Sequence, residues 1–570
     1  MKSSWHPHER SLSLRSLVGQ MEEPPAWLNE SWEDPQGFYR GLKRSLDSLF
    51  TIHGASALFN TYDFFHDIIH RNRTHNYPAM VWFRGDGERR ELSWEELGRR
   101  ASIKAAKWER HGLKAGECLC VIREVGPELA TDLLAAFKLG AVVSLLPTEA
   151  RGFILRRLTA LDPQWIATDS RTVKKLGEWN ERVLPMVATR CDIPSDHRHF
   201  HGYASGETVF RLFSRGSSSE IEAVEISSDA AYLSAACSGL LGLGIYPGMR
   251  LCTPDFDLLL CQPFLLLSSL LCGATYVHVT QSDLLHHKGL PTGAKPDVFG
   301  VTPWVRDLFL KERSALEVPC ARWFKDPVSS LEYDRWQLFA GANGFEEVPA
   351  FNLRWDAAKG GCLLFSMGRK GIAHPGVLPM PGALWSVGEE GSEDAALFQT
   401  GELHLASPGT EATCLEPCGV TLSAHGEIWL CTGGAGTQRQ GMACPVDEIT
   451  AFLNERGRGL GVIFETLTFP RSDLKGGEQM VVIGFTGARN VPSFLSRLKK
   501  EAEQLIEKEM GPWALPDGIW LYPLYPRFES PGVSDRKWCR DAWLSGVLAR
   551  RAKHPVFLCT TRLRSHLVES

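Results

Sequence analysis

The stretch CLCVIREVGPELATDLLAAFKLGAVVSLLP, residues 118–147, decides the fold class of this 570-residue chain. Its first part, Cys118 to Ile122, is apolar without alternation, which is typical of a strand buried on both faces. Pro127 opens a helical segment and Gly140 ends it. A second apolar run, Ala141 to Leu146, predicts another strand. Strand, helix and strand with short links form a parallel unit, so we predict an α/β protein.

The same alternation extends in both directions from this unit. Ser93 stands before a helical segment with Glu96 three residues later, which is the spacing of a capping box, and Gly112 ends that helix. Further strands are expected at 80–83, 251–254, 274–279 and 298–301, with helices at 228–243 and after Pro303.

Changes of composition divide the chain into four parts. We expect an N-terminal extension at 1–50, a large body of parallel α/β layers at 51–432, a small α+β cap domain at 433–548 and a tail at 549–570. Gly433 and Gly434 make a plausible hinge, and short strands in the Gly-rich part of the body predict a β-subdomain at about 360–430. The cap should contain helices at 446–456 and 492–510 and strands at 462–469, 480–486 and 518–525.

Composition narrows the function classes. Lys and Arg number 62 and Asp and Glu 67, so the net charge is −5, and no basic surface typical of a dedicated nucleic-acid binder is expected. Apolar residues make up 44% and charged residues 23%, as in an ordinary globular protein.

The cysteines and the apolar segments favour a cytoplasmic protein. The 15 cysteines are scattered and form no Cys-x-x-Cys pair, which fits reduced, buried thiols. The polar start of the chain lacks the apolar core of a signal peptide. The most apolar stretch, 258–271, covers about 14 residues, whereas a membrane-spanning helix needs about 20, so no membrane span is predicted.

A series of different short motifs lies between about residues 60 and 545. They are Leu92–Leu97, Gly112–Glu117, Ala135–Ala141, Val301–Pro303, Gly401–Leu403, Pro445 with Glu448–Ile449, and Asp535–Lys537. In order and spacing the set resembles the adenylate-forming superfamily, which comprises AMP-binding acyl-CoA synthetases, adenylation domains and luciferase-like enzymes. The resemblance implies ATP- and Mg²⁺-dependent formation of an acyl-adenylate, followed by transfer of the acyl group to CoA or to a carrier protein.

The phosphate-binding loop of that family falls on Phe213–Val224, between a strand and a helix. The family loop is rich in Thr, Ser and Gly and carries a lysine near its end. The matching nucleotide-binding candidates here are Ser214, Arg215, Gly216, Ser217, Ser218 and Glu222. Glu222 occupies the lysine position, which reverses the local charge. Two unit charges about 4 Å apart interact by about 4 kcal/mol at an effective dielectric constant of about 20.

The remaining catalytic motifs are also altered. Where the resemblance implies a Thr-Glu pair whose Glu holds Mg²⁺, the chain has Ala357–Ala358, and only Asp356 could serve as a displaced ligand. No Asp occurs between Gly409 and Gly426, where a ribose-binding Thr-Gly-Asp is expected. The hinge motif falls on the neutral segment 432–436, and Val533 stands where the family has its catalytic lysine. No catalytic residue and no metal ligand can therefore be assigned.

Several of these residues have two interpretations. The loop is either a residual phosphate cradle or an ordinary polar loop, and Glu222 is either salt-bridged in the altered site or solvated. Asp535 and Arg536 are expected to be structural. His197, His199 and His201 alternate along an extended segment, which would suit Zn²⁺ or Ni²⁺, but a solvated loop is the simpler interpretation.

Three hypotheses follow. The first is a diverged ligase-family protein that is impaired in acyl-adenylate formation and acts as a binding or scaffold partner in acyl metabolism. The alternative is an active AMP-forming acyl- or aryl-CoA or carrier-protein ligase with a rebuilt site that uses Arg215 and Asp356. The third is a pocket that binds acyl or aryl groups without activating them. Expected partners are a carboxylate, CoA, an acyl-carrier protein or an active paralogue.

Overall fold

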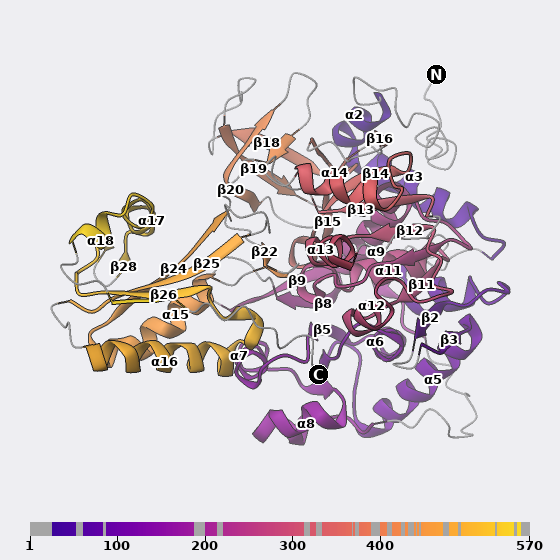
Figure 1. The fold of residues 1–570 in the computed structure, drawn as a ribbon. Coiled ribbons are helices and arrows are strands. Elements are labelled where there is room, and N and C mark those ends of the chain that lie inside the picture. Colours follow the sequence, from indigo (N-terminus) through magenta and orange to yellow (C-terminus); the bar gives the residue numbers. More distant parts are fainter. Residues whose placement is uncertain are drawn as a thin grey trace.

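The computed structural model describes most of the chain. The described residues are 26–52, 61–83, 87–186, 200–213, 221–312, 320–326, 333–366, 369–370, 376–388, 400–406, 413–422, 428–430, 438–439, 442–443, 446–470, 478–487, 492–530, 533–551 and 556–559. They form a large α/β body, a four-stranded β-subdomain and a small domain that lies to one side of the body (Figure 1).

The segment 118–147 folds as predicted. It forms strand β4 (Cys118–Ile122), helix α6 (Pro127–Leu139) and strand β5 (Val142–Leu146), and the two strands are parallel neighbours. Gly140 has a φ of 74°, the left-handed conformation that ends helices and that glycine adopts readily. These strands belong to a five-stranded sheet in the order β6-β4-β5-β8-β9, completed by β6 (Trp165–Ala167), β8 (Thr208–Phe213) and β9 (Ala223–Ser227).

A second, ten-stranded sheet forms the rest of the body. Its parallel core contains β2 (Met80–Phe83), β11 (Thr275–His278), β10 (Arg250–Cys252), β12 (Val298–Gly300), β13 (Arg322–Lys325) and β14 (Pro349–Asp356), side by side in that order. The short strands β3 (Arg89–Leu92), β15 (Gly361–Phe365), β16 (Arg369–Lys370) and β17 (Leu378–Pro379) add antiparallel pairs at its two edges.

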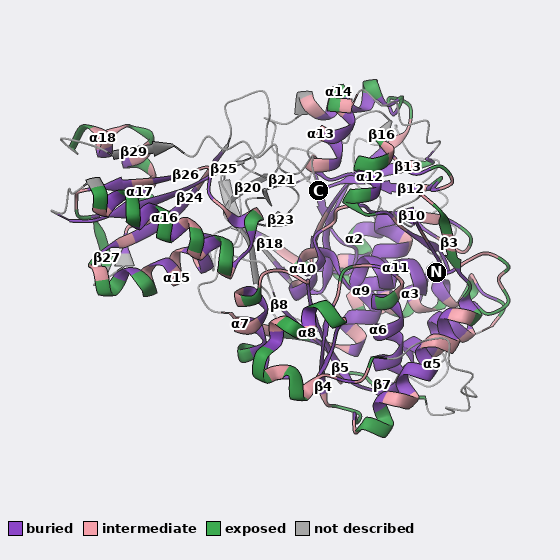
Figure 2. Ribbon diagram, turned by 60° about the horizontal axis from the view of Figure 1, so that its bottom comes forward, coloured by how far each residue is buried: buried purple, intermediate pink, exposed green. Residues whose placement is uncertain are grey.

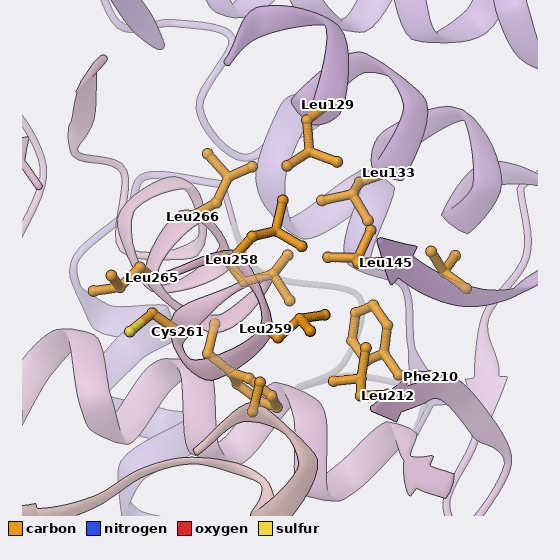
Figure 3. Packing of buried hydrophobic residues seen from close by; sticks show 14 of the residues in the cluster. Leu129, Leu133, Leu145, Phe210, Leu212, Leu258, Leu259, Cys261, Leu265 and Leu266 are labelled. Atoms are coloured by element: carbon orange, nitrogen blue, oxygen red, sulfur yellow. The ribbon is translucent and has the colours of Figure 1, made fainter. Parts of the chain in front are cut away.

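The two sheets are joined by a layer of apolar helices. Helices α9 (Ser228–Cys237), α10 (Leu258–Cys261) and α11 (Phe264–Leu271) pack against strands of both sheets. All eight side chains of α11 are buried, as expected for a helix that is apolar on every side. Leu258, Leu259 and Cys261 meet Leu133, Leu145 and Phe210 in this layer (Figure 3).

Strand β10 marks the point where the chain reverses direction across the ten-stranded sheet. The chain runs from β10 to β11 on one side, and then returns through α12 (Gln281–His287) to β12 on the other side. Helices α12, α13 (Pro303–Glu312) and α14 (Tyr333–Ala342) contribute to a separate core on the opposite face. In such sheets ligands bind beyond the carboxyl ends of the strands at the reversal. The ends of β10 and β12 are therefore a natural place for a site.

The C-terminal part contains the β-subdomain and the small domain. The β-subdomain is an antiparallel sheet of β18 (Leu384–Gly388), β19 (Thr400–Ala406), β20 (Thr413–Leu422) and β21 (Ile428–Leu430). The small domain contains β24 (Ile463–Pro470), β25 (Glu478–Phe485), β26 (Gly518–Tyr522), α15 (Val446–Gly457), α16 (Pro492–Glu509), α17 (Arg536–Leu544) and α18 (Val547–Arg551).

The ends of the chain are more closely integrated than the sequence indicates. Strand β29 (Val556–Cys559) pairs with β26, so part of the expected tail belongs to the sheet of the small domain. Helices α2 (Ala26–Glu33) and α3 (Pro35–Ser48) pack against the body and bury Phe38, Leu42 and Leu46 in its main core. The described part of the expected N-terminal extension thus packs on the body. Most residues of these helices that face the body are buried (Figure 2).

Among the described residues, no helix is both long enough and apolar enough to cross a membrane. The apolar stretch 258–271 is divided between α10 and α11, which are separated by Gln262 and Pro263.

Candidate functional site

The predicted phosphate loop connects two antiparallel strands. Phe213, the last residue of β8, pairs with Ala223, the first residue of β9. Ser214, Arg215, Gly216, Ser217 and Ser218 lie outside the described residues. Glu222 is described and exposed, and it has no ion pair with any described residue. Because the adjacent residues 214–220 lie outside the described part of the chain, both interpretations of Glu222 stay open.

Asp356 lies beside the base of this loop. It ends β14, and the short helix η5 (Ala357–Lys359) that follows packs against both β8 and β9. The Asp356 carboxylate accepts a hydrogen bond from the Ala358 amide at 3.1 Å. Burial raises the pKa of Asp356, although Lys359 and Arg354 act in the opposite direction. The structure thus brings together two predicted site regions that are far apart in the sequence.

A second group of polar side chains lies where β10 and β12 end. Asp255 follows β10 and accepts a hydrogen bond from the Thr302 hydroxyl, which follows β12, at 2.9 Å. The Gln281 amide at the start of α12 also donates to Asp255. Asp255 has a φ of 65°, and burial raises its pKa to about 7 despite these hydrogen bonds.

Asp255 is a site residue that the sequence motifs do not indicate. Its signal was available, because an Asp directly after one predicted parallel strand and a Thr directly after another must meet if the two strands are neighbours. The sequence alone does not reveal the order of the strands in the sheet, and it is this order that places β10 beside β12.

The carboxyl ends of these strands form an acidic environment. Asp257 caps α10 by accepting hydrogen bonds from the Leu259 and Leu260 amides at 2.8 and 3.0 Å. Burial raises the pKa of the Cys261 thiol, and the nearby carboxylates of Asp257, Asp326 and Asp356 raise it further.

The C-terminal motif residues have structural partners. Asp535 caps α17 by accepting a hydrogen bond from the Trp538 amide at 2.9 Å. Arg536 forms ion pairs with Asp447 and with the buried Glu465, the latter at 2.5 Å. Val533 lies in the short strand β28 (Val533–Ser534), which is at the far side of the small domain from β8 and β9 in Figure 1.

The predicted histidine cluster and the hinge segment lie mostly outside the described residues. His197 and His199 lie outside the described residues, while His201 forms an ion pair with Glu207 at 3.0 Å if its ring is protonated. Within the described ranges, no group of three or more His, Cys, Asp or Glu side chains could hold a metal ion. The hinge segment 432–436 also lies outside the described residues.

Comparison with curated proteins gives short partial matches. No protein-family model matches the chain. The hybrid PKS-NRPS synthetase pydA from an Acremonium species is 28% identical over 121 residues, or 21% of this chain. Malformin synthetase mlfA from Aspergillus brasiliensis is 28% identical over 139 residues, or 23% of this chain. The match covers only 3% of the length of each relative.

Solved structures match over most of the chain. An o-succinylbenzoate CoA synthetase from Bacillus subtilis has a TM-score of 0.65 at 14% identity, covering 84% of this chain and 98% of that one. The amide bond synthetase McbA from Marinactinospora thermotolerans has a TM-score of 0.64 at 13% identity, with coverages of 84% and 99%. An artificially fused adenylation–PCP di-domain from Klebsiella oxytoca has a TM-score of 0.62 at 14% identity, with coverages of 87% and 98%. At this level of identity the likeness establishes the fold.

Proposed function

We propose that this chain, which has the fold of the adenylate-forming ligases, is impaired in acyl-adenylate formation and acts as a binding or scaffold partner in acyl metabolism. The observation that carries the proposal is the state of Asp356. Its carboxylate is the one acid left where the resemblance places a Mg²⁺ ligand, yet it accepts the Ala358 amide of its own chain. The two residues that follow are the buried alanines Ala357 and Ala358, whose side chains offer no ligand atom.

The charge around this position supports the same conclusion. A triphosphate needs cations or backbone N–H groups to offset its charge. The described residues supply the exposed Glu222 and the carboxylates of Asp255 and Asp257. Arg354 is engaged with Asp326 at 3.5 Å. Lys359 is a cation beside Asp356. Residues 214–220, which the resemblance assigns to phosphate binding, lie outside the described residues, so we assign no step through ATP and Mg²⁺.

Pyrophosphate exchange tests the proposal directly. The purified chain is incubated with ATP, Mg²⁺, labelled pyrophosphate and a panel of aliphatic and aromatic carboxylic acids. We expect no label in ATP above a boiled control, while the Bacillus subtilis o-succinylbenzoate CoA synthetase serves as the positive control with its own acid. Acid-dependent exchange by this chain would overturn the proposal and support the alternative, an active ligase with a rebuilt site.

Ligand-dependent melting separates loss of ATP binding from loss of chemistry. A ligand at 100 times its Kd stabilises a protein by about 2.7 kcal/mol, so binding at millimolar ATP and Mg²⁺ would raise the melting temperature. We expect no shift with ATP and Mg²⁺ but a shift with a free carboxylate, CoA or an acyl-carrier protein. A shift with acids or CoA alone favours a binding role, whereas a shift with carrier protein favours scaffolding.

The cellular setting is part of the proposal. We place the protein in the cytoplasm, because nine of its cysteines are buried free thiols: Cys118, Cys120, Cys237, Cys252, Cys261, Cys272, Cys320, Cys362 and Cys539. An active paralogue is a further proposed partner, since an impaired ligase-like chain could act by assembling with a working one. Co-purification with a catalytically active ligase of the same fold would support this, and a monomer in the presence of that ligase would oppose it.

A further inference from the structure

Helix α7 (Arg151–Leu161) of the body carries two arginines that contact the small domain. The guanidinium of Arg157 donates two hydrogen bonds to Glu448 of α15, one to each carboxylate oxygen, at 3.2 and 2.9 Å. Both residues are buried, with exposed fractions of 2% for Arg157 and 5% for Glu448. A fork-to-fork pair of this kind is the strongest geometry that an arginine and a carboxylate can adopt.

Arg156 extends this contact to a second helix of the small domain. Its guanidinium donates to Glu448 at 2.9 Å and to the Glu509 carboxylate, at the end of α16, also at 2.9 Å. Gly152 allows the close approach, because a Cβ atom there would lie 1.9 Å from a Glu509 carboxylate oxygen. The Trp513 indole donates to Glu149 at 3.2 Å on the same face.

The carboxylate of Glu448 is held in its ionised form. Burial by itself would raise its pKa, but the two arginines outweigh that effect, and the net result is a lowered pKa. Removing one partner of a buried pair leaves an uncompensated charge, which is strongly unfavourable. Separation of the small domain from α7 would expose this pair to water, which would weaken the attraction within it.

Arg157 also reaches the root of the predicted phosphate loop. Its guanidinium lies over the Phe153 ring at 3.6 Å and within 5.8 Å of the Phe213 ring. Phe213 is the last residue of β8 and directly precedes residue 214. One side chain therefore contacts both the small domain and the residue from which the loop begins.

We propose that Glu448 with Arg156 and Arg157 forms an interdomain latch. The latch holds the small domain on α7, and through Arg157 it makes the position of Phe213, and hence the root of the 214–220 loop, depend on whether the small domain is docked. Release of Glu448 would loosen the contact between α7 and the small domain and change the surroundings of Phe213. This inference concerns a conformational device and holds whether or not the chain forms acyl-adenylates.

Hydrogen–deuterium exchange on the full chain tests the latch. The variant Glu448→Gln keeps the shape of the side chain and removes its charge. We expect exchange in α7, in α15 and in residues 208–213 to become about tenfold faster or more, as loss of a buried pair predicts. Exchange in the central strands β2 and β12 should stay unchanged, and the radius of gyration from small-angle scattering should increase.

The matched control is Arg151→Met on the same helix. Arg151 donates to the Lys175 carbonyl within the body at 3.0 Å, so its loss should leave small-domain exchange unchanged. Unchanged exchange in α7 and α15 of Glu448→Gln would overturn the latch. Faster exchange there with no change at 208–213 would overturn the coupling to the loop.

A second variant keeps the latch testable if Glu448→Gln does not fold. If β2 and β12 lose protection in Glu448→Gln, the same regional readout is taken on Arg156→Met, whose side chain is 27% exposed and more tolerant of change. Faster exchange in α7 and α15 alone supports the latch, and unchanged exchange overturns it. Because none of these measurements uses ATP or an acid, failure of the latch is independent of failure of the proposed function.

Discussion

Two charge-rich regions of this molecule differ in what their charges do. On the docking face of α7, Arg156 and Arg157 are matched by Glu448 and Glu509, and Glu448 accepts from both arginines. At the base of the 214–220 loop, Glu222 points to solvent and Asp356 is occupied with capping a helical turn. The first region is organised to hold two domains together, whereas the second combines the acids Glu222 and Asp356 with the nearby cations Lys359 and Arg354 and has no such matched pairing among its described residues.

The difference also separates the motif residues on which the resemblance rests. Glu448 and Arg536 belong to motifs that match the adenylate-forming superfamily, and both lie in ion pairs that stabilise the small domain or its docking. Glu222 and Ala358, which the resemblance assigns to altered positions, form no ion pair within the described part of the chain. The ion pairs of Glu448 and Arg536 thus give these two motif residues a structural role.

The largest expected effect is on the docking face. Arg157→Ala leaves Glu448 buried without its two-pronged partner, and we expect it to lower the free energy of unfolding by about 3–5 kcal/mol. Urea denaturation followed by tryptophan fluorescence measures the change. Arg151→Ala on the same helix is the control and should cost less than about 0.5 kcal/mol. Equal losses in the two variants would remove the distinction between the docking face and the rest of α7.

A medium effect is expected at Asp255, which lies outside both regions at the end of β10. Its pKa is raised to about 7 from an ordinary value of 3.8, so the folded state holds a proton that the unfolded state has lost between these pH values. This contribution to stability is complete below about pH 4 and disappears as pH rises through 7. In the wild type this effect lowers the free energy of unfolding between pH 5 and pH 8. In Asp255→Asn we expect that loss to be smaller by on the order of 2 kcal/mol, measured by urea unfolding at the two pH values. Parallel pH profiles of the two proteins would contradict this.

A smaller effect is expected at Asp535, which represents the retained motifs. Asp535→Ala removes the cap of α17 and should cost about 1 kcal/mol in thermal or urea unfolding. Asp541 lies on the same helix and is exposed, so Asp541→Ala should change stability far less. If Asp535→Ala left the stability of the protein unchanged, the structural explanation for this motif would fail.

The smallest effect is expected at Glu222. Because this side chain is exposed, Glu222→Lys should change the free energy of unfolding by no more than about 0.5 kcal/mol. It should also leave the melting temperature insensitive to millimolar ATP and Mg²⁺, since Ala357 and Ala358 still provide no ligand. An ATP-dependent shift in the variant but not in the wild type would identify the charge at 222 as the one missing element.

Local structure was largely predictable from the sequence. Ser93 accepts a hydrogen bond from the Glu96 amide at 3.1 Å, as the capping motif predicts, and Gly112 ends the helix with a φ of 116°. Glu96 does not complete the capping box in the expected way, because its carboxylate pairs with Arg99 and Arg100. Such features depend on residues only a few positions apart, so the local sequence predicts them directly.

Long-range partners were not predictable in the same way. Arg157 and Glu448 are separated by 291 positions, and nothing in the local pattern of either residue indicates the other. Strand β2 joins a different sheet from β4, although only one helix and a short antiparallel strand separate them in the chain. Asp255 meets Thr302 only because β12 lies beside β10. The candidate site was therefore located by motif order, while its charge pairing came from the fold.

The two N-terminal helices have a practical consequence for anyone who shortens this protein. Trp32 and Tyr39 donate hydrogen bonds to the Met380 and Pro381 carbonyls, and the Phe38 and Tyr39 rings lie against Gly382. A fragment that starts at residue 51 would expose the apolar surface of the body that these helices cover, called here the seat. We expect such a fragment to aggregate during expression, because large exposed apolar patches promote self-association. A fragment that starts at residue 26 keeps the seat covered and is the better choice for crystallisation.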